Sequence, residues 1–150
     1  MKQPIKSVLV PLDYSEPAFH AAWIALAIAR SMRASLTLFH IHLQEKATRE
    51  TVVIEYDKLS ELTDEAYPSL LEDVVIDPSV DTLRARKFSE VEFETATHSL
   101  SNEICDYARD HEIGLIVIGA KIHSILHDVL LGNLTTKVVD KAPCPVTVVH

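Results

Sequence analysis

The stretch with the clearest chemical potential is Gly119–Val138, which follows a short apolar run and holds two of the chain's three glycines. A glycine directly after a strand lets the backbone turn sharply and approach a ligand closely. Gly132 and Asn133 then precede a segment with the pattern of a short helix, Leu134–Lys141, for which Asn133 is a good N-cap. Because the free N–H groups of a helix N-terminus bind anions, the stretch predicts a phosphate cradle.

This stretch also resembles the nucleotide-binding loop of the universal stress proteins, whose nucleotide-binding members carry G-x-x-G, a spacer and then G-S/T. The register holds here, with Gly119, Ile122 and, after nine further residues, Gly132-Asn133. Ile122 stands where glycine is usual and Asn133 where Ser or Thr is usual, whereas Thr135 matches a Thr often found just after. The likeness continues in VLVPLDYSEPA and APCPVTVV, and covers nearly the whole chain except residues 44–90.

The resemblance implies a pocket for an adenine nucleotide, ATP or AMP, with magnesium accompanying the nucleotide and no other metal. The pocket residues that it implies are Pro11, Leu12, Asp13, Ile41, Gly119, Ile122, His123, Gly132, Asn133, Leu134 and Thr135. If the position of Ile122 requires a positive φ, a β-branched residue is strongly disfavoured there, and its side chain occupies space that a triphosphate needs. We therefore expect weak or absent nucleotide binding. A module that binds ATP or AMP and signals by occupancy is the alternative.

The remaining polar candidates each have a structural alternative. Asp13 ends an apolar run, and acids at strand ends recur in the ligand crevices of α/β sheets, but Asp13 could equally cap a helix or turn. Asn133 and Thr135 are phosphate contacts or local caps. The histidines include pairs two or four residues apart, yet no tight ligand motif with a carboxylate supports a metal centre, and we expect none.

Catalysis finds little support in the sequence. The chain has no G-x-S-x-G nucleophile elbow, Walker loop or G-x-G-x-x-G fingerprint. Without a nucleophile–base pair or a metal-bound water, rapid turnover is not expected. We therefore predict that the protein is not an enzyme, with slow ATP hydrolysis as the remaining alternative.

The elements that would position these residues alternate between strand and helix. Apolar runs or alternation predict strands at Ser7–Leu12, Ser35–His42, Val91–Thr97, Leu115–Ile118 and Val146–Val149. Helical patterns fall at Glu16 to about Met32, from Val52 to Ala66, at Ser79–Lys87, around Leu100–Ala108 and at Leu134–Lys141. Alternation favours parallel pairing, hence an open doubly wound, Rossmann-like α/β sheet of five parallel strands with helices on both faces. The resemblance implies the order 3-2-1-4-5.

Composition restricts the class of protein. A chain of 150 residues with 47% hydrophobic residues predicts one domain, 1–150, with a real core, and Trp23 is expected inside it. The net charge of −8 argues against nucleic-acid binding, and no apolar run is long enough to span a membrane. The two cysteines suit a reduced, cytoplasmic protein. Val146–Val149 is an apolar edge strand that predicts a homodimer, beside a protein partner that the sequence does not identify.

Overall fold

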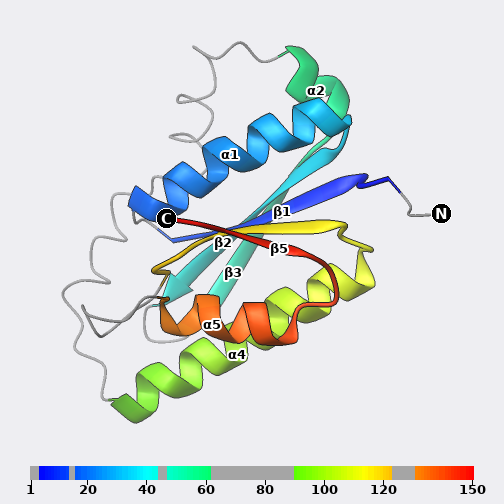
Figure 1. Ribbon diagram of the computed structural model, residues 1–150. Coiled ribbons are helices and arrows are strands. Elements are labelled where there is room, and N and C mark those ends of the chain that lie inside the picture. The colour runs from blue at the N-terminus through cyan, green and yellow to red at the C-terminus, as the bar shows by residue number, and fades with distance from the viewer. Residues whose placement is uncertain (1–3, 14–15, 44–46, 62–89, 123–130) are drawn as a thin grey trace.

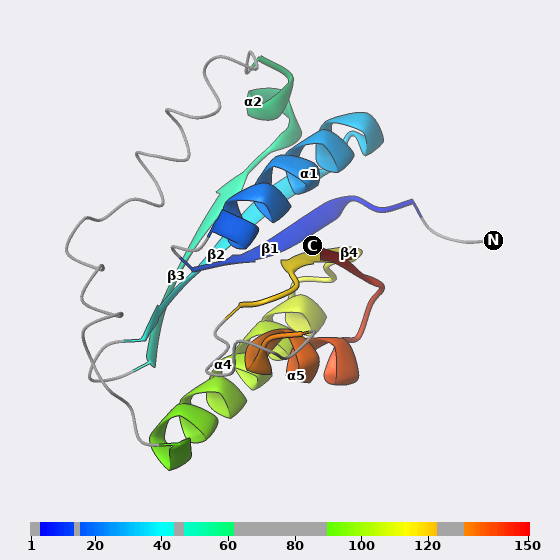
Figure 2. The same cartoon turned by 60° about the vertical axis from the view of Figure 1, so that its left-hand side comes forward.

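The computed structural model describes residues 4–13, 16–43, 47–61, 90–122 and 131–150, with the backbone alone described for 41–43, 47–50, 90–94 and 96. The strands are β1 (Ser7–Leu12), β2 (Ser35–Leu43), β3 (Ala47–Ile54), β4 (Leu115–Gly119) and β5 (Val146–Val149). The helices are α1 (Glu16–Met32), α2 (Tyr56–Glu61), α4 (Glu90–Asp110) and α5 (Asn133–Lys141). Figures 1 and 2 show a twisted sheet with α1 and α2 on one face and α4 and α5 on the other.

The sheet has the order β3-β2-β1-β4-β5, which confirms the expected order. β1 pairs in parallel with β2 and with β4, and β4 pairs in parallel with β5. β3 runs antiparallel to β2, so the sheet is mixed and the expectation of an all-parallel sheet is wrong. Only residues 44–46 join β2 to β3, and such a short connection makes a hairpin, whereas a parallel crossover needs a dozen or more residues.

The third strand was predicted at Val91–Thr97, and this prediction is wrong because these residues lie in the first turns of α4. Their alternation fits a strand, but the buried Leu100 and Ile104 continue the segment at helical spacing. The true third strand, Ala47–Ile54, is rich in β-branched residues, which favour strands. Of the helix predicted from Val52 to Ala66, residues 52–54 lie in β3, residues 56–61 form α2, and residues 62–66 lie outside the described residues. The helix predicted at Ser79–Lys87 also lies outside them.

Helix α1 packs on the sheet through small side chains. Ala18, Ala21, Ala22, Ala25 and Ala29 are fully buried along one stripe. Trp23 is 38% exposed, so the prediction that it belongs to the core is wrong. With 100° between successive residues, Trp23 projects from the side of α1 opposite this alanine stripe.

Helices α1 and α4 end in the same way before a strand. Arg33 and Glu112 have positive φ angles of 55° and 52°. The two paired backbone bonds of a Schellman motif follow in each case, as in Ile113 N–H to the Ala108 carbonyl at 2.8 Å. Because this motif terminates each helix abruptly, the chain continues directly into β2 after α1 and into β4 after α4.

The core between the sheet and α4 includes an aromatic contact. The ring of Phe39 on β2 meets that of Tyr107 on α4 edge to face, with centroids 5.8 Å apart. Because successive strand residues face opposite sides, Leu36, Leu38 and His40 face the α1 layer. Within the described residues, no helix is both long and apolar enough to cross a membrane.

Candidate functional site

The candidate site lies where β1 and β4 end side by side. The two strands are parallel neighbours, with Val8 opposite Leu115 and Leu9 opposite Ile116, so their carboxyl ends reach the same edge of the sheet. The chain leaves β1 toward α1 on one face and leaves β4 toward α5 on the other (Figure 1). This is the position at which open α/β sheets form a ligand crevice.

Gly119, the last residue of β4, lies in close contact with the start of α1. A Cβ on Gly119 would lie 3.0 Å from the carbonyl carbon and oxygen of Pro17 and 3.2 Å from the nitrogen of Ala18. No described glycine has a positive φ, so Gly119 is required here for space. The predicted turn glycine therefore acts by letting the N-terminus of α1 approach the sheet.

A second close approach joins the two ends of the loop between β4 and α5. The amide of Gly132 donates a 2.6 Å hydrogen bond to the carbonyl of Ala120. A Cβ on Gly132 would overlap the carbonyl oxygen of Ile122 and lie 2.8 Å from its nitrogen. Gly132 thus lies against Ala120 and Ile122, and this contact places the N-terminus of α5 beside the end of β4.

The side chain of Thr135 also holds the start of α5 to the end of β4. Its side chain is fully buried, and its hydroxyl donates a 2.7 Å hydrogen bond to the carbonyl of Gly119. The hydroxyl proton of Thr135 is therefore engaged in a hydrogen bond within the protein. Of the two roles that the sequence left open for Thr135, a phosphate contact or a local cap, the structure shows its hydroxyl in a structural hydrogen bond to Gly119.

Ile122 is a core residue in this structure. Its side chain is fully buried within the main hydrophobic cluster. Arg33 and Glu112 are the described non-glycine residues with positive φ, so Ile122 has an ordinary backbone conformation. The premise that this position needs a positive φ is therefore wrong. The isoleucine side chain is therefore part of the core, and a glycine at this position would leave its space empty.

The start of α5 supplies the backbone N–H groups of the candidate site. The helix begins at Asn133, and Gly132 occupies the cap position without a side-chain cap hydrogen bond. The prediction that Asn133 is the N-cap is therefore wrong by one residue. The first intrahelical bond runs from Thr136 N–H to the Gly132 carbonyl at 3.0 Å, so the N–H groups of residues 133–135 precede it. Leu134 contributes only its backbone, since its side chain is buried.

The other predicted pocket residues lie at the strand ends. Pro11, Leu12 and Asp13 are all buried, Asp13 with 7% of its surface exposed. Ile41 lies in β2 opposite Arg49, and its side chain falls outside the description. His123 lies outside the described residues. Lys121, which the sequence pattern did not single out, is exposed on the loop between Gly119 and Ile122.

The histidines do not gather into a metal centre within the described part of the chain. No group of three His, Cys, Asp or Glu side chains there is placed to hold a metal ion. His98 instead lies 3.4 Å from the ammonium of Lys141, which donates to the Asn102 side chain at 3.3 Å. This cluster ties α4 to α5.

Comparisons with known proteins agree with this geometry. A Universal stress protein family model matches residues 4–150. Universal stress protein YxiE of Bacillus subtilis is 25% identical over 147 residues, which cover 95% of this chain and 97% of that protein.

Solved structures share the fold. UspA from Lactobacillus plantarum is similar with a TM-score of 0.60 and 27% identity, over 99% of this chain and 100% of that chain. A universal stress protein in complex with cAMP is similar with a TM-score of 0.53 and 16% identity, over 99% and 98%. The family match spans nearly the whole sequence, and the chain belongs to the universal stress protein family.

Proposed function

We propose that this protein acts in the stress response as a cytoplasmic homodimer that works through protein contacts, with weak or absent binding of adenine nucleotides and without catalysis. The proposal of weak nucleotide binding rests on two residues of the candidate site whose side chains face the interior of the protein. Ile122 packs in the core, and the Thr135 hydroxyl is bound to Gly119. Among the described residues of this loop, the groups that remain for a phosphate chain are backbone N–H groups at the start of α5 and the exposed Lys121.

The experiment is calorimetric titration of the native protein with ATP, AMP and inorganic phosphate. We expect no measurable ATP binding in the low micromolar range and weak binding of small anions. Lys121→Gln should weaken the remaining anion binding, because it removes the exposed charge without touching the core. Lys58→Gln, which removes an exposed lysine on α2, is the matched control and should change nothing. Low-micromolar ATP affinity in the native protein would overturn the proposal.

A nucleotide-binding signalling module is the second candidate function. It is favoured by the position of the α5 N-terminus at the candidate site and by the ordinary conformation of Ile122. The related protein whose structure contains cAMP adds a ligand to test, although cAMP binding there is a property of that protein. Tight binding of ATP, AMP or cAMP that Lys121→Gln weakens and Lys58→Gln leaves unchanged would favour this candidate.

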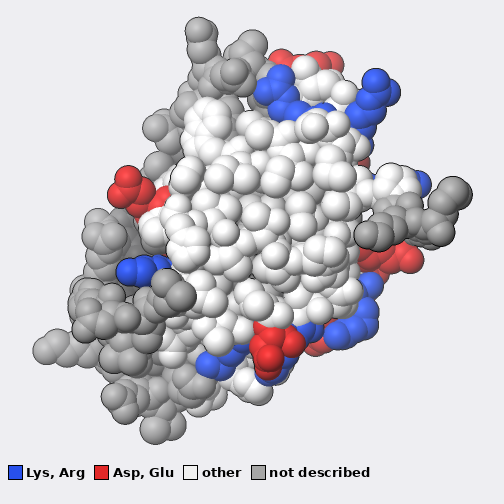
Figure 3. All heavy atoms as spheres, in the orientation of Figure 1, with Lys and Arg blue, Asp and Glu red and all other residues white. Residues whose placement is uncertain are grey.

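The dimer is proposed from the edge strand β5. Within the described residues β5 pairs only with β4, and its Val146 and Val148 are half-buried. Figure 3 shows an uncharged face over β5 and α1, with Lys, Arg, Asp and Glu at its margins. An apolar edge strand in an uncharged surface favours association. A two-fold axis beside β5 would let two copies pair this strand in a closed, self-complementary contact.

Sedimentation velocity tests the dimer. The native protein at micromolar concentration should sediment as a dimer, and Val146→Lys or Val148→Lys should shift it toward monomer by placing charge in the contact. Val53→Lys is the matched control, because Val53 is exposed on β3, at the opposite edge of the sheet. A native monomer, or a Val53→Lys protein that alone dissociates, would refute a dimer through β5.

A further inference from the structure

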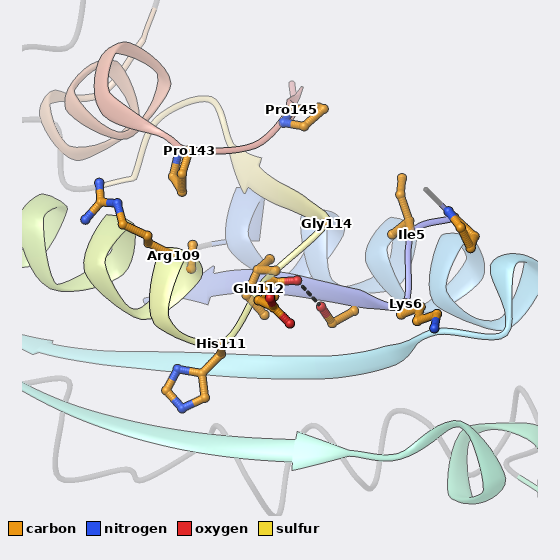
Figure 4. A pocket seen from close by; sticks show the side chains of 12 residues that line it. Ile5, Lys6, Arg109, His111, Glu112, Gly114, Pro143 and Pro145 are labelled. Atoms are coloured by element: carbon orange, nitrogen blue, oxygen red, sulfur yellow. Dashed lines mark hydrogen bonds between the residues drawn. The ribbon is translucent and has the colours of Figure 1, made fainter. Parts of the chain in front are cut away.

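The two cysteines of the chain lie in segments that contact each other. Cys105 belongs to α4, and Cys144 lies between α5 and β5. The ammonium of Lys141, the last residue of α5, donates a 3.3 Å hydrogen bond to the side chain of Asn102, three residues before Cys105. Pro143 then lines a cavity together with residues of α4 that follow Cys105 (Figure 4). The segment that leads to Cys144 therefore runs beside the part of α4 that carries Cys105.

The side chain of Cys105 lies on the side of α4 that meets the end of α5. With 100° between successive helix residues, His98, Asn102 and Cys105 share one stripe of α4. Lys141 contacts the first two members of this stripe, at 3.4 Å and 3.3 Å. Cys105 is 3% exposed and is a free thiol. Its sulfur is therefore buried in the layer that α4 and α5 form on one face of the sheet.

The side chain of Cys144 faces the same layer from the sheet. Gly119 of β4 pairs with Val149 of β5, and a Cβ on Gly119 would point toward the start of α1. Because successive strand residues face opposite sides, Val146, three residues before Val149, faces the layer of α4 and α5. This alternation continues back to Cys144, which is half-buried between two exposed prolines and packs against the core. One thiol thus enters the layer from the helix and the other from the sheet.

Electrostatic coupling between the two thiols agrees with this placement. Burial raises the pKa of the Cys144 thiol, and a charge on Cys105 raises it further. Because the interaction between two charges weakens with distance, the coupling indicates neighbouring sulfurs. Burial also raises the pKa of Cys105. Both thiols are therefore protonated at neutral pH, and their oxidation should be slow there, since the thiolate is the reactive form.

We propose that Cys105 and Cys144 form a redox pair, which peroxide converts to a reversible intramolecular disulfide between α4 and the segment that precedes β5. The thiolate of Cys144, the more exposed of the two, attacks one oxygen of hydrogen peroxide, and the O–O bond breaks to give a sulfenic acid and hydroxide. The thiolate of Cys105 then forms the S–S bond and displaces hydroxide from the Cys144 sulfur. The two thiols lose two electrons and two protons, and the peroxide becomes two molecules of water.

Mass spectrometry of the oxidised native chain tests the pair. The reduced protein, freed of reductant, is exposed to hydrogen peroxide at about pH 7 and about pH 8.5. Catalase ends the reaction, and iodoacetamide in urea then labels the thiols that remain. We expect an unlabelled chain that is lighter by two hydrogen atoms, with the peptides of Cys105 and Cys144 joined until dithiothreitol separates them. The reaction should be faster at the higher pH, because more thiolate is present.

Two variants serve as controls. In Cys105→Ser the remaining thiol has no partner, so Cys144 should stay open to iodoacetamide or carry a sulfenic acid that dimedone labels. Cys105→Ala with Ser31→Cys keeps two thiols but places one at an exposed position of α1, on the other face of the sheet (Figure 1). This variant should form no intramolecular disulfide.

Three results for the native chain would overturn the inference. These are two thiols that both remain open to iodoacetamide, separate oxidation of each sulfur, and a covalent dimer through Cys144 on a non-reducing gel. An equal yield of intramolecular disulfide in the Ser31→Cys control would also contradict it, because the link would then not depend on the placement of Cys105 beside Cys144.

Discussion

The hydroxyl of Thr135 donates a 2.7 Å hydrogen bond to the carbonyl of Gly119, and this bond fixes the start of α5 to the end of β4. The two residues are sixteen positions apart, and both are buried. The bond lies at the centre of the candidate site, because Gly119 ends β4 there and Thr135 lies in the first turn of α5.

Thr135→Val should lower the free energy of unfolding by about 1–3 kcal/mol, because it leaves the buried Gly119 carbonyl without its donor. Thr136→Val is the matched control. Its hydroxyl bonds to the Gly132 carbonyl at 3.0 Å, but the side chain is exposed, so the loss should stay within about 0.5 kcal/mol. Urea unfolding followed by circular dichroism measures both. Equal losses of unfolding free energy in the two variants would show that the buried Thr135 hydrogen bond contributes no more to stability than the exposed one of Thr136.

Three glycine variants should fall in a defined order of stability. Gly132→Ala should cost the most, because its Cβ would overlap the backbone of Ile122. Gly119→Ala should cost about 1–3 kcal/mol, since the Cβ would meet the backbone of Pro17. Gly114→Ala should cost the least, because its contacts with Ile5 are the longest of the three sets, 3.1 Å to a side-chain methyl and 3.3 Å to the Cα. Thermal melts give the ranking, and a Gly114→Ala protein less stable than the others would contradict this account.

Ile122→Gly should destabilise the protein by at least about 2–5 kcal/mol, the cost of emptying a fully buried aliphatic site. Ile122→Val, which keeps the branch and removes one methyl group, should cost only about 0.5–1.5 kcal/mol. Denaturant unfolding gives both values, and calorimetry with ATP on the same samples shows whether either change opens the loop. A neutral Ile122→Gly would mean that the side chain is not part of the core.

Arg33→Gly should stabilise the protein by up to about 1 kcal/mol, because glycine adopts a positive φ without the steric cost that a side chain meets. Ser31→Gly, two residues earlier and exposed within α1, is the control, and glycine in a helix should cost about 0.5–1 kcal/mol there. The opposite signs of the two changes in midpoint temperature are the expected result. A loss of stability in both would indicate that the guanidinium of Arg33 contributes more than the backbone strain costs.

Stability should fall in the alkaline range through the two cysteines. Burial raises the pKa of the Cys144 thiol, and a charge on Cys105 raises it further, whereas a hydrogen bond from the Ile116 backbone lowers it. Burial is also the main cause of the raised pKa of Cys105. A folded-state pKa above the unfolded one gives stability that is complete below the unfolded pKa, about 8.5, and is lost as the pH rises through the folded value.

The measurement is unfolding free energy from pH 7 to 10 for the native protein and for Cys105→Ala with Cys144→Ala. The double variant should show a smaller loss above about pH 8.5. Alkylation by iodoacetamide at pH 8 should be slower in the folded protein than in urea, because fewer thiols are ionised and both are sheltered. Identical pH profiles for the two proteins would contradict a contribution from the thiols.

The sequence by itself determined the elements with strong local patterns. Ser7–Leu12, Glu16–Met32 and Val146–Val149 were predicted with the bounds that the structure gives. The apolar runs are long enough for buried strands, and Ser15-Glu16-Pro17 is a specific helix start. The spacing of Gly119 and Gly132 after β4 likewise located the loop and the helix that follows it, because a glycine stands at each end of the loop and a helix-start residue follows the second.

The tertiary structure decided what local pattern leaves open. Val91–Thr97 alternates like a strand, but the buried positions that continue along α4 make it a helix, while Ala47–Ile54 pairs with β2 and becomes the third strand. Trp23 has a hydrophobic side chain on a helix whose alanine face makes the sheet contact. Ile122 and Thr135 turn inward because the Gly132 and Gly119 backbones approach their neighbours closely. These outcomes depend on contacts between residues distant in sequence, which no local spacing encodes.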